Sequence, residues 1–234
     1  MGAIRGVVFD KDGTLYDFEA TWGRWTVELI DGLAEGDGRL AQRMADSVGF
    51  DLAQRRFDPA SPVIAGTPDG AADLLGPHLP DLPRGALIAR MNALAARAPL
   101  VEAAPLAPLL AGLRGRGLRL GVATNDAESA ARAHLQVSGV VAAFEFIAGY
   151  DSGFGAKPGP GMLEGFVRAT GLPAGSVAMV GDSLHDLEAG RAAGMVTLGV
   201  LTGPATEGDL APLADAVLPD IGHLPDWLDA RGAG

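Results

Sequence analysis

The segment Ile4-Arg5-Gly6-Val7-Val8-Phe9 runs directly into Asp10-Lys11-Asp12-Gly13-Thr14-Leu15, and this stretch decides the fold. Its first part is rich in β-branched and aromatic residues, which is typical of a buried parallel strand. The strand leads into two carboxylates, Asp10 and Asp12. Alternation along an extended chain places both on one side, and Gly13 lets the backbone turn away after them. The stretch therefore predicts a strand that presents a pair of acidic side chains at its carboxyl end.

The composition indicates a folded protein without a polyanionic partner. The 234 residues suffice for one large domain or a domain with an insert, and an apolar fraction of 48% supports a real core. The net charge of −11 argues against nucleic acid or an anionic membrane as a partner. No apolar run approaches a membrane span, and no secretory segment opens the chain. We expect a soluble, cytoplasmic protein, either a monomer or a homodimer.

From Gly117 onward, predicted strands alternate with predicted helices. The predicted strands are 118–124, 144–148, 176–180, 196–201 and 216–218. The predicted helices are 127–138, 161–170, 184–193 and 224–230. Such alternation predicts an α/β fold, a Rossmann-like, doubly wound parallel sheet with helices on both faces. Ligands of such a sheet bind at the carboxyl ends of its strands.

Residues 17–99 have a different pattern. Helical periodicity covers 18–33, 40–48, 70–75 and 84–97, with proline-rich joints and no strand signal between them. We therefore expect an α/β core formed by 1–16 and 100–234, with an all-helical cap inserted at 17–99. Trp22 and Trp25 are expected in the interior of the cap, although either could cover a ligand.

Three further polar sites follow predicted strands of the core, namely Thr124 with Asn125, Lys157, and Asp182 with Asp186. Thr124 and Asn125 stand where a helix begins, and a hydroxyl beside free backbone N–H groups can bind a phosphate. The same residues also suit an ordinary helix start, with Asn125 or Asp126 as its N-cap. Asp182 and Asp186, four residues apart, can face one point if the chain turns helical there. Here too the alternative is a helix cap, formed by Asp182 or Ser183.

Only two of the 18 basic residues are lysines, Lys11 and Lys157. For Lys11 an ordinary exposed ammonium is a reasonable interpretation, whereas Lys157 lies in the loop Gly155-Ala156-Lys157-Pro158-Gly159-Pro160. Two unit charges about 4 Å apart repel by roughly 4 kcal/mol at an effective dielectric near 20, so carboxylate attack on a phosphate needs cations. Aspartates without cysteine or clustered histidine suit Mg²⁺ rather than zinc. Lys157 is the plausible ammonium.

These four segments, in this order and spacing, resemble the haloacid dehalogenase superfamily, and more narrowly its phosphoglycolate-phosphatase-like hydrolases with a helical cap. The resemblance implies a phosphatase that acts on a small phosphorylated metabolite, of the phosphoglycolate or sugar-phosphate type. It implies that Asp10 is the nucleophile, which forms an aspartyl-phosphate, and that Asp12 is the general acid and base. Thr124, the Asn125 amide and Lys157 would hold the phosphoryl group. The implied ligands of Mg²⁺ are Asp10, the Asp12 backbone carbonyl, Asp182 and Asp186, the last directly or through water.

Residue differences remove some reactions of this family. Asp12 points to an oxygen leaving group, because expulsion of a halide needs no proton. The absence of lysine from 17–99 excludes the branch that forms a Schiff base on a cap lysine. A β-phosphoglucomutase-like mutase remains the alternative. A catalytically silent relative is a further alternative, but it would lack Asp10, Asp12 or Lys157.

The cap contains few obvious substrate contacts. The hinge Tyr16-Asp17-Phe18 is bulkier than in typical phosphoglycolate phosphatases, which makes phosphoglycolate itself a doubtful substrate. Arg55, Arg56 and Thr67 could contact an acid or a sugar, but each is better interpreted as an ordinary exposed side chain.

Overall fold

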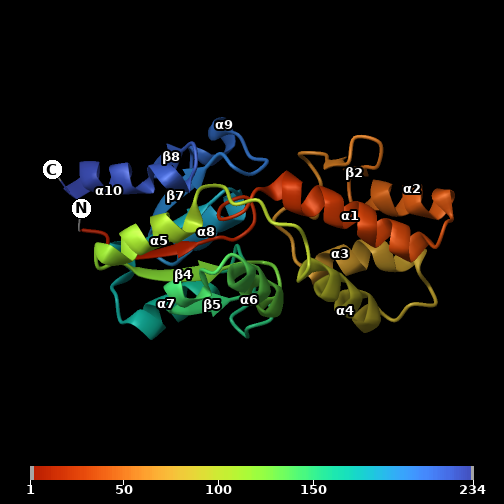
Figure 1. Ribbon diagram of the computed structural model, residues 1–234, viewed down its shortest axis with the longest axis horizontal. Helices are drawn as coiled ribbons and strands as arrows, with labels where there is room; N and C mark the ends of the chain where they lie inside the picture. The colour runs from red at the N-terminus through yellow and green to blue at the C-terminus, as the bar shows by residue number, and fades with distance from the viewer. Residues whose placement is uncertain (1–2, 233–234) are drawn as a thin grey trace.

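The computed structural model describes residues 3–232. A six-stranded sheet flanked by helices fills one end of the molecule, and helices α1 to α4 gather at the other (Figure 1). The described part of the chain begins and ends, at residues 3 and 232, at the end that is distant from these four helices.

The large sheet is parallel throughout, in the order β5-β4-β1-β6-β7-β8. Its strands are β1 (Gly6–Phe9), β4 (Arg119–Ala123), β5 (Phe146–Ala148), β6 (Val177–Gly181), β7 (Val196–Val200) and β8 (Ala216–Leu218). Because β1 pairs with both β4 and β6, the opening stretch of the sequence lies at the centre of the sheet. The predicted doubly wound α/β fold is confirmed.

Helices cover both faces of this sheet. They are α5 (Leu106–Gly115), α6 (Glu128–Val137), α7 (Gly161–Thr170), α8 (Leu184–Ala192), α9 (Glu207–Leu210) and α10 (Leu224–Gly232). Alternate residues of β1 enter different cores, since Val7 and Phe9 pack with residues of α5 and α6, and Val8 packs with residues of α7 and α8. Burial on both faces explains why the strand is continuously apolar.

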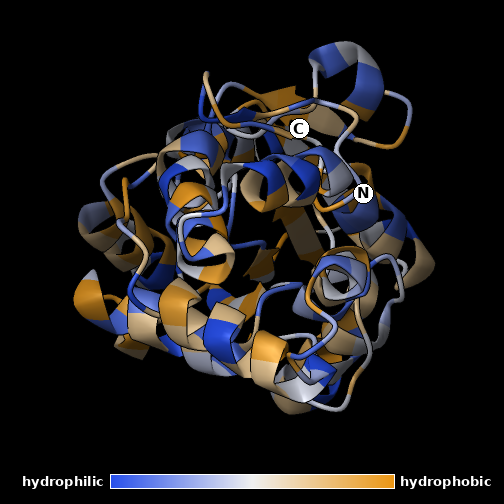
Figure 2. Cartoon of the chain, turned by 90° about the vertical axis from the view of Figure 1, so that its right-hand side faces the viewer, coloured by the Kyte–Doolittle hydropathy of each residue, from blue (hydrophilic) through white to orange (hydrophobic). Residues whose placement is uncertain are grey.

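The cap, by which we mean residues 17–99, has its own hydrophobic core. Its helices are α1 (Phe18–Ala34), α2 (Gly38–Ser47), α3 (Pro68–Leu75) and α4 (Arg84–Ala95). Three of them begin at side chains that accept backbone hydrogen bonds, namely Asp17, Asp37 and Thr67. Viewed from the cap end, hydrophobic and hydrophilic residues alternate along these helices, as amphipathic packing requires (Figure 2).

Several local predictions differ from the structure. The cap also contains a short hairpin, β2 (Phe50–Asp51) with β3 (Arg56–Phe57), whose two-residue strands are too short to leave a period in the sequence. Helix α5 was not predicted, because its leucines follow a proline-rich joint that suggested only a return to the sheet. The N-cap residue of helix α6 is Ala127, and no side chain caps the helix there. The prediction that Asn125 or Asp126 is the N-cap is therefore wrong.

No helix within residues 3–232 combines the length and the hydropathy that crossing a membrane requires.

Candidate active site

Three polar residues meet where the central strands end. Asp10 follows β1, Thr124 follows β4, and Asp182 follows β6. Parallel pairing in register brings these carboxyl ends to one edge of the sheet, and the backbone N–H of Asp10 donates to the Val180 carbonyl at 2.8 Å. All three residues are buried and line one cavity.

Lys157 connects two of the carboxylates. Its Nζ donates to Asp10 Oδ1 at 2.7 Å, to Asp186 Oδ1 at 2.6 Å and to the Ala123 carbonyl at 2.8 Å. Burial alone would lower the pKa of Lys157, but the ion pairs with Asp10 and Asp186 raise it above its ordinary value. The ammonium therefore stays charged beside the carboxylate predicted to be the nucleophile.

The Asn125 side chain holds the Lys157 loop in place. Its Oδ1 accepts from the Lys157 backbone N–H at 2.8 Å, and its Nδ2 donates to the carbonyls of Lys157 and of Ala65 in the cap. Thr124 is buried beside it, and its hydroxyl accepts from the Asp126 N–H at 3.0 Å. The Asn125 side chain thus joins the core to the cap, a role that the sequence did not indicate.

Asp10, Asp182 and Asp186 form a buried cluster in which one oxygen from each lies within 4.8 Å of the others. Burial raises the pKa of Asp10 to about 7, with Lys157 opposing this shift. Burial, with the neighbouring Asp10 and Asp186, also raises the pKa of Asp182 well above its ordinary value. Such a cluster of hard oxygen donors, with its shortage of positive charge, suits a divalent cation.

Asp182 and Asp186 differ within this cluster. Among residues 3–232 no basic side chain pairs with Asp182, which receives only a long 3.5 Å contact from the Thr14 hydroxyl. In Asp186, by contrast, one oxygen accepts from Lys157 and the other accepts from the N–H and hydroxyl of Ser183, the N-cap of α8. Asp182 is therefore the carboxylate most in need of a cation, and Asp186 also acts as a helix cap.

Two glycines leave room for the Asp182 carboxylate. A Cβ on Gly13 would lie 2.2 Å from Asp182 Oδ2, and a Cβ on Gly203 would lie 1.7 Å from it. Sequence reasoning used Gly13 only as a turn residue and did not consider Gly203, which lies after β7. The Gly203-Pro204 pair indicates a turn in the sequence, but it does not indicate that Gly203 lies against Asp182.

The interpretation of Lys11 as an exposed ammonium is wrong. Lys11 is fully buried, and its Nζ donates to Asp12 Oδ1 at 2.7 Å and lies 3.1 Å from Asp126 Oδ2. Burial alone would lower the pKa of Lys11, but Asp12 and Asp126 raise it. Its other neighbours are His134, with Nδ1 at 3.1 Å, and the ring of Trp22, with its centroid at 5.3 Å. Lys11 thus holds Asp12 as Lys157 holds Asp10.

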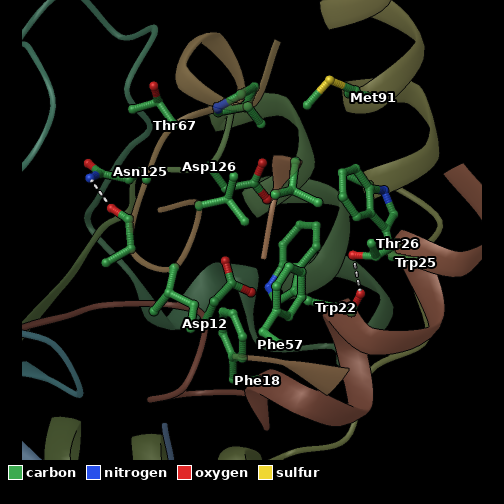
Figure 3. A pocket seen from close by; sticks show the side chains of 18 of the residues that line it. Asp12, Phe18, Trp22, Trp25, Thr26, Phe57, Thr67, Met91, Asn125 and Asp126 are labelled. Atoms are coloured by element: carbon green, nitrogen blue, oxygen red, sulfur yellow. Dashed lines mark hydrogen bonds between the residues drawn. The ribbon is translucent and has the colours of Figure 1, made fainter. Parts of the chain in front are cut away.

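The edge of the sheet opens into a cavity of about 130 Å³ between the core and the cap. Figure 3 shows Asp12 in this cavity together with Phe18, Trp22 and Phe57 of the cap. Trp22 and Trp25 both line it, so they are wall residues as well as part of the cap interior. Thr67 also lines the cavity, whereas Arg55 and Arg56 are exposed outside it.

The chain is similar to known proteins over most of its length. A family model for haloacid dehalogenase-like hydrolases matches residues 4–194. A phosphoglycolate phosphatase of Rhodospirillum rubrum is 33% identical over 229 residues, which cover 96% of this chain and 90% of the relative. The crystal structure of an HAD phosphatase from Thermococcus onnurineus superposes with a TM-score of 0.68 at 23% identity, covering 96% of this chain and 98% of the other. For CbbY from Rhodobacter sphaeroides in complex with phosphate, the TM-score is 0.63 at 23% identity, with 94% and 96% covered.

These similarities confirm the predicted resemblance to the phosphoglycolate-phosphatase-like hydrolases and the prediction of an enzyme that hydrolyses phosphoric monoesters. The family match spans every segment from β1 to α8, including the strand ends that carry the buried aspartates. The chain belongs to the haloacid dehalogenase-like hydrolases.

Proposed function

We propose that the protein is a Mg²⁺-dependent phosphatase that hydrolyses a small phosphorylated metabolite through an aspartyl-phosphate on Asp10. One observation carries the proposal. Asp10 and Asp182 lie in one buried cluster, Lys157 is paired with Asp10, and this cluster opens into a cavity large enough for a small organic group. We assign residues 17–99 as the cap that closes this cavity.

The reaction proceeds in two displacements. Asp10 attacks the phosphorus through a carboxylate oxygen, the bond from phosphorus to the ester oxygen breaks, and Asp12 gives a proton to the departing alcohol. Water then attacks the phosphorus of the acyl phosphate while Asp12 accepts its proton, which releases inorganic phosphate and restores Asp10. The Thr124 hydroxyl and the backbone N–H of Asn125 hold phosphoryl oxygens, and Lys157 orients Asp10 and offsets the negative charge.

Asp10, Asp182 and the Asp12 carbonyl are the proposed ligands of Mg²⁺, with Asp186 acting through water because its two oxygens already accept hydrogen bonds. The bound ion would neutralise the phosphate charge and polarise a phosphoryl oxygen. Lys157 alone cannot offset three carboxylates and a phosphate dianion, which is the charge argument for the ion.

The test is hydrolysis of p-nitrophenyl phosphate by the purified chain. We expect release of phosphate that requires Mg²⁺ and falls by at least about 10³-fold in Asp10→Asn, because the nucleophile is lost. Asp12→Asn should retain phosphate on the protein, detectable as a mass increase. Asp81→Asn, an exposed aspartate of the cap, is the control and should keep full activity.

Activity that persists in excess chelator or in Asp10→Asn contradicts the proposal. A mutase-like activity would appear as an isomerised sugar phosphate rather than free phosphate. A catalytically silent relative would give neither product.

A further inference from the structure

The cap side of the cavity is apolar and without charge. Among the described residues, every cap side chain that lines it is neutral. Four are the aromatic residues Phe18, Trp22, Trp25 and Phe57, and most of the others are aliphatic. From this wall we propose that the alcohol part of the substrate is a branched-alkyl or aryl-alkyl group, without a carboxylate and without several hydroxyls. The inference rests on the proposed phosphatase function and concerns the leaving group alone.

A carboxylate in this cavity would lack a cation. The core side supplies Lys157, whose ammonium already donates to three oxygens, and His185, whose Nδ1 lies 3.1 Å from the carbonyl of Ala65. The two arginines of the hairpin, Arg55 and Arg56, lie outside the cavity wall. Since burial of an unpaired carboxylate is strongly unfavourable, the wall selects against phosphoglycolate.

A sugar would also lack partners. The cap wall offers few polar atoms, and the Thr26 hydroxyl already donates to the Trp22 carbonyl at 2.8 Å. Within residues 3–232, Trp25 Nε1 and Asn92 Oδ1 are buried in this wall without a hydrogen-bond partner. One donor and one acceptor can serve a single neutral oxygen-containing group, but a polyol would leave several hydroxyls unpaired. Apolar surface, by contrast, gains free energy on leaving water.

The experiment compares phosphate esters whose alcohols are similarly poor leaving groups. Benzyl phosphate, 3-methylbutyl phosphate, 2-phosphoglycolate and glucose 6-phosphate are all alkyl esters, so differences in kcat/KM report recognition rather than the ease of bond cleavage. With the full chain and Mg²⁺, we expect kcat/KM for the two apolar esters to exceed that for phosphoglycolate by at least about tenfold, which is about 1.4 kcal/mol.

A substitution in the wall should reverse this preference. Ile64 lines the cavity from a loop and is only partly buried, so Ile64→Arg introduces a guanidinium with little damage to the cap core. We expect the ratio of benzyl phosphate to phosphoglycolate in kcat/KM to fall at least about tenfold. The matched control is Val137→Arg, at a position that is 79% exposed on α6 and outside the cavity, where the ratio should stay unchanged. Ile64→Val should also keep the preference, which covers the case in which Ile64→Arg fails to fold.

The outcomes separate the inference from the function on which it rests. Equal or better hydrolysis of phosphoglycolate or glucose 6-phosphate, while p-nitrophenyl phosphate is also hydrolysed, overturns the inference alone. A folded Ile64→Arg variant with an unchanged ratio overturns it as well. Failure to release phosphate from any ester, p-nitrophenyl phosphate included, overturns the proposed function.

Discussion

The two ends of the cavity consist of opposite kinds of side chain. At the core end, Asp10, Asp182 and Lys157 are ionisable and buried, and Lys157 donates to Asp10 at 2.7 Å. At the cap end, Trp22, Phe57 and their neighbours are neutral and packed by shape. The difference teaches that two separate requirements meet in one space. Charge at the core end suits a phosphoryl group, whereas the apolar wall suits whatever is attached to it.

The charged end has a paired construction that the cap lacks. Both lysines of the chain are buried there, and each contacts one carboxylate of the opening motif, Lys157 with Asp10 and Lys11 with Asp12. In a chain that otherwise uses arginine as its basic residue, this points to a need for compact ammonium groups. A lysine ammonium is smaller than a planar guanidinium and can contact several acceptors at once.

Among substitutions that test the charged end of the cavity, Lys11→Met should have the largest effect on stability. The change leaves the buried Asp126 and the partly buried Asp12 without their cation, so we expect a loss of about 3–5 kcal/mol in the free energy of unfolding. Urea denaturation measures it. Arg84→Met is the control, because it also removes a base that contacts two aspartates, Asp69 and Asp73, but at an exposed site. An equal loss in both variants would show that burial of Lys11 contributes little.

A smaller change in the free energy of unfolding is expected for Asp182→Asn, and without metal this change has the opposite sign. In chelator the variant should be at least as stable as the parent, because it removes a buried negative charge that lies near two others. Added Mg²⁺ should stabilise the parent, by about 2.7 kcal/mol when its concentration is a hundredfold above Kd, and should stabilise the variant far less. Urea denaturation with and without Mg²⁺ provides the readout. Equal stabilisation of both proteins would place the ion elsewhere.

The smallest expected effect is the pH dependence that His134 contributes. Burial, and then Lys11, lower the pKa of His134, whose Nε2 lies 2.6 Å from the Ala95 carbonyl of the cap. A histidine with a lowered folded-state pKa stabilises the fold fully above its unfolded pKa, near 6.5, and this contribution is lost as the pH falls below that value. We expect His134→Gln to lose less thermal stability than the parent between about pH 7.5 and 5.5. Parallel melting curves for the two proteins would contradict this.

The core was predictable because its signals are local. A continuous apolar strand followed by Asp10 and Asp12 indicates a buried strand with a polar end, and the same reasoning applies to Thr124 and Asp182. Parallel strands must end at one edge, so the meeting of these residues follows from the fold class alone. The roles of these residues in binding metal and phosphate remain proposals.

The missed features depend on partners that are distant in the sequence. The Lys11 ammonium contacts Asp126 and His134, which are more than one hundred positions away in the sequence. The side-chain amide of Asn125 donates to the Ala65 carbonyl of the cap. No periodicity or motif connects such pairs. The hairpin at 50–57 was missed for another reason, since strands of two residues are shorter than any recognisable alternation.

By itself, the amino-acid sequence determined the sheet, the insertion of a largely helical segment and the positions of the acidic strand ends, because backbone geometry turns residue order directly into these features. Only the tertiary structure decided which charges are buried together and that the cap presents an apolar wall to them. Side-chain contacts across the two parts of the molecule arise from packing, and packing depends on the whole chain rather than on any one stretch of it.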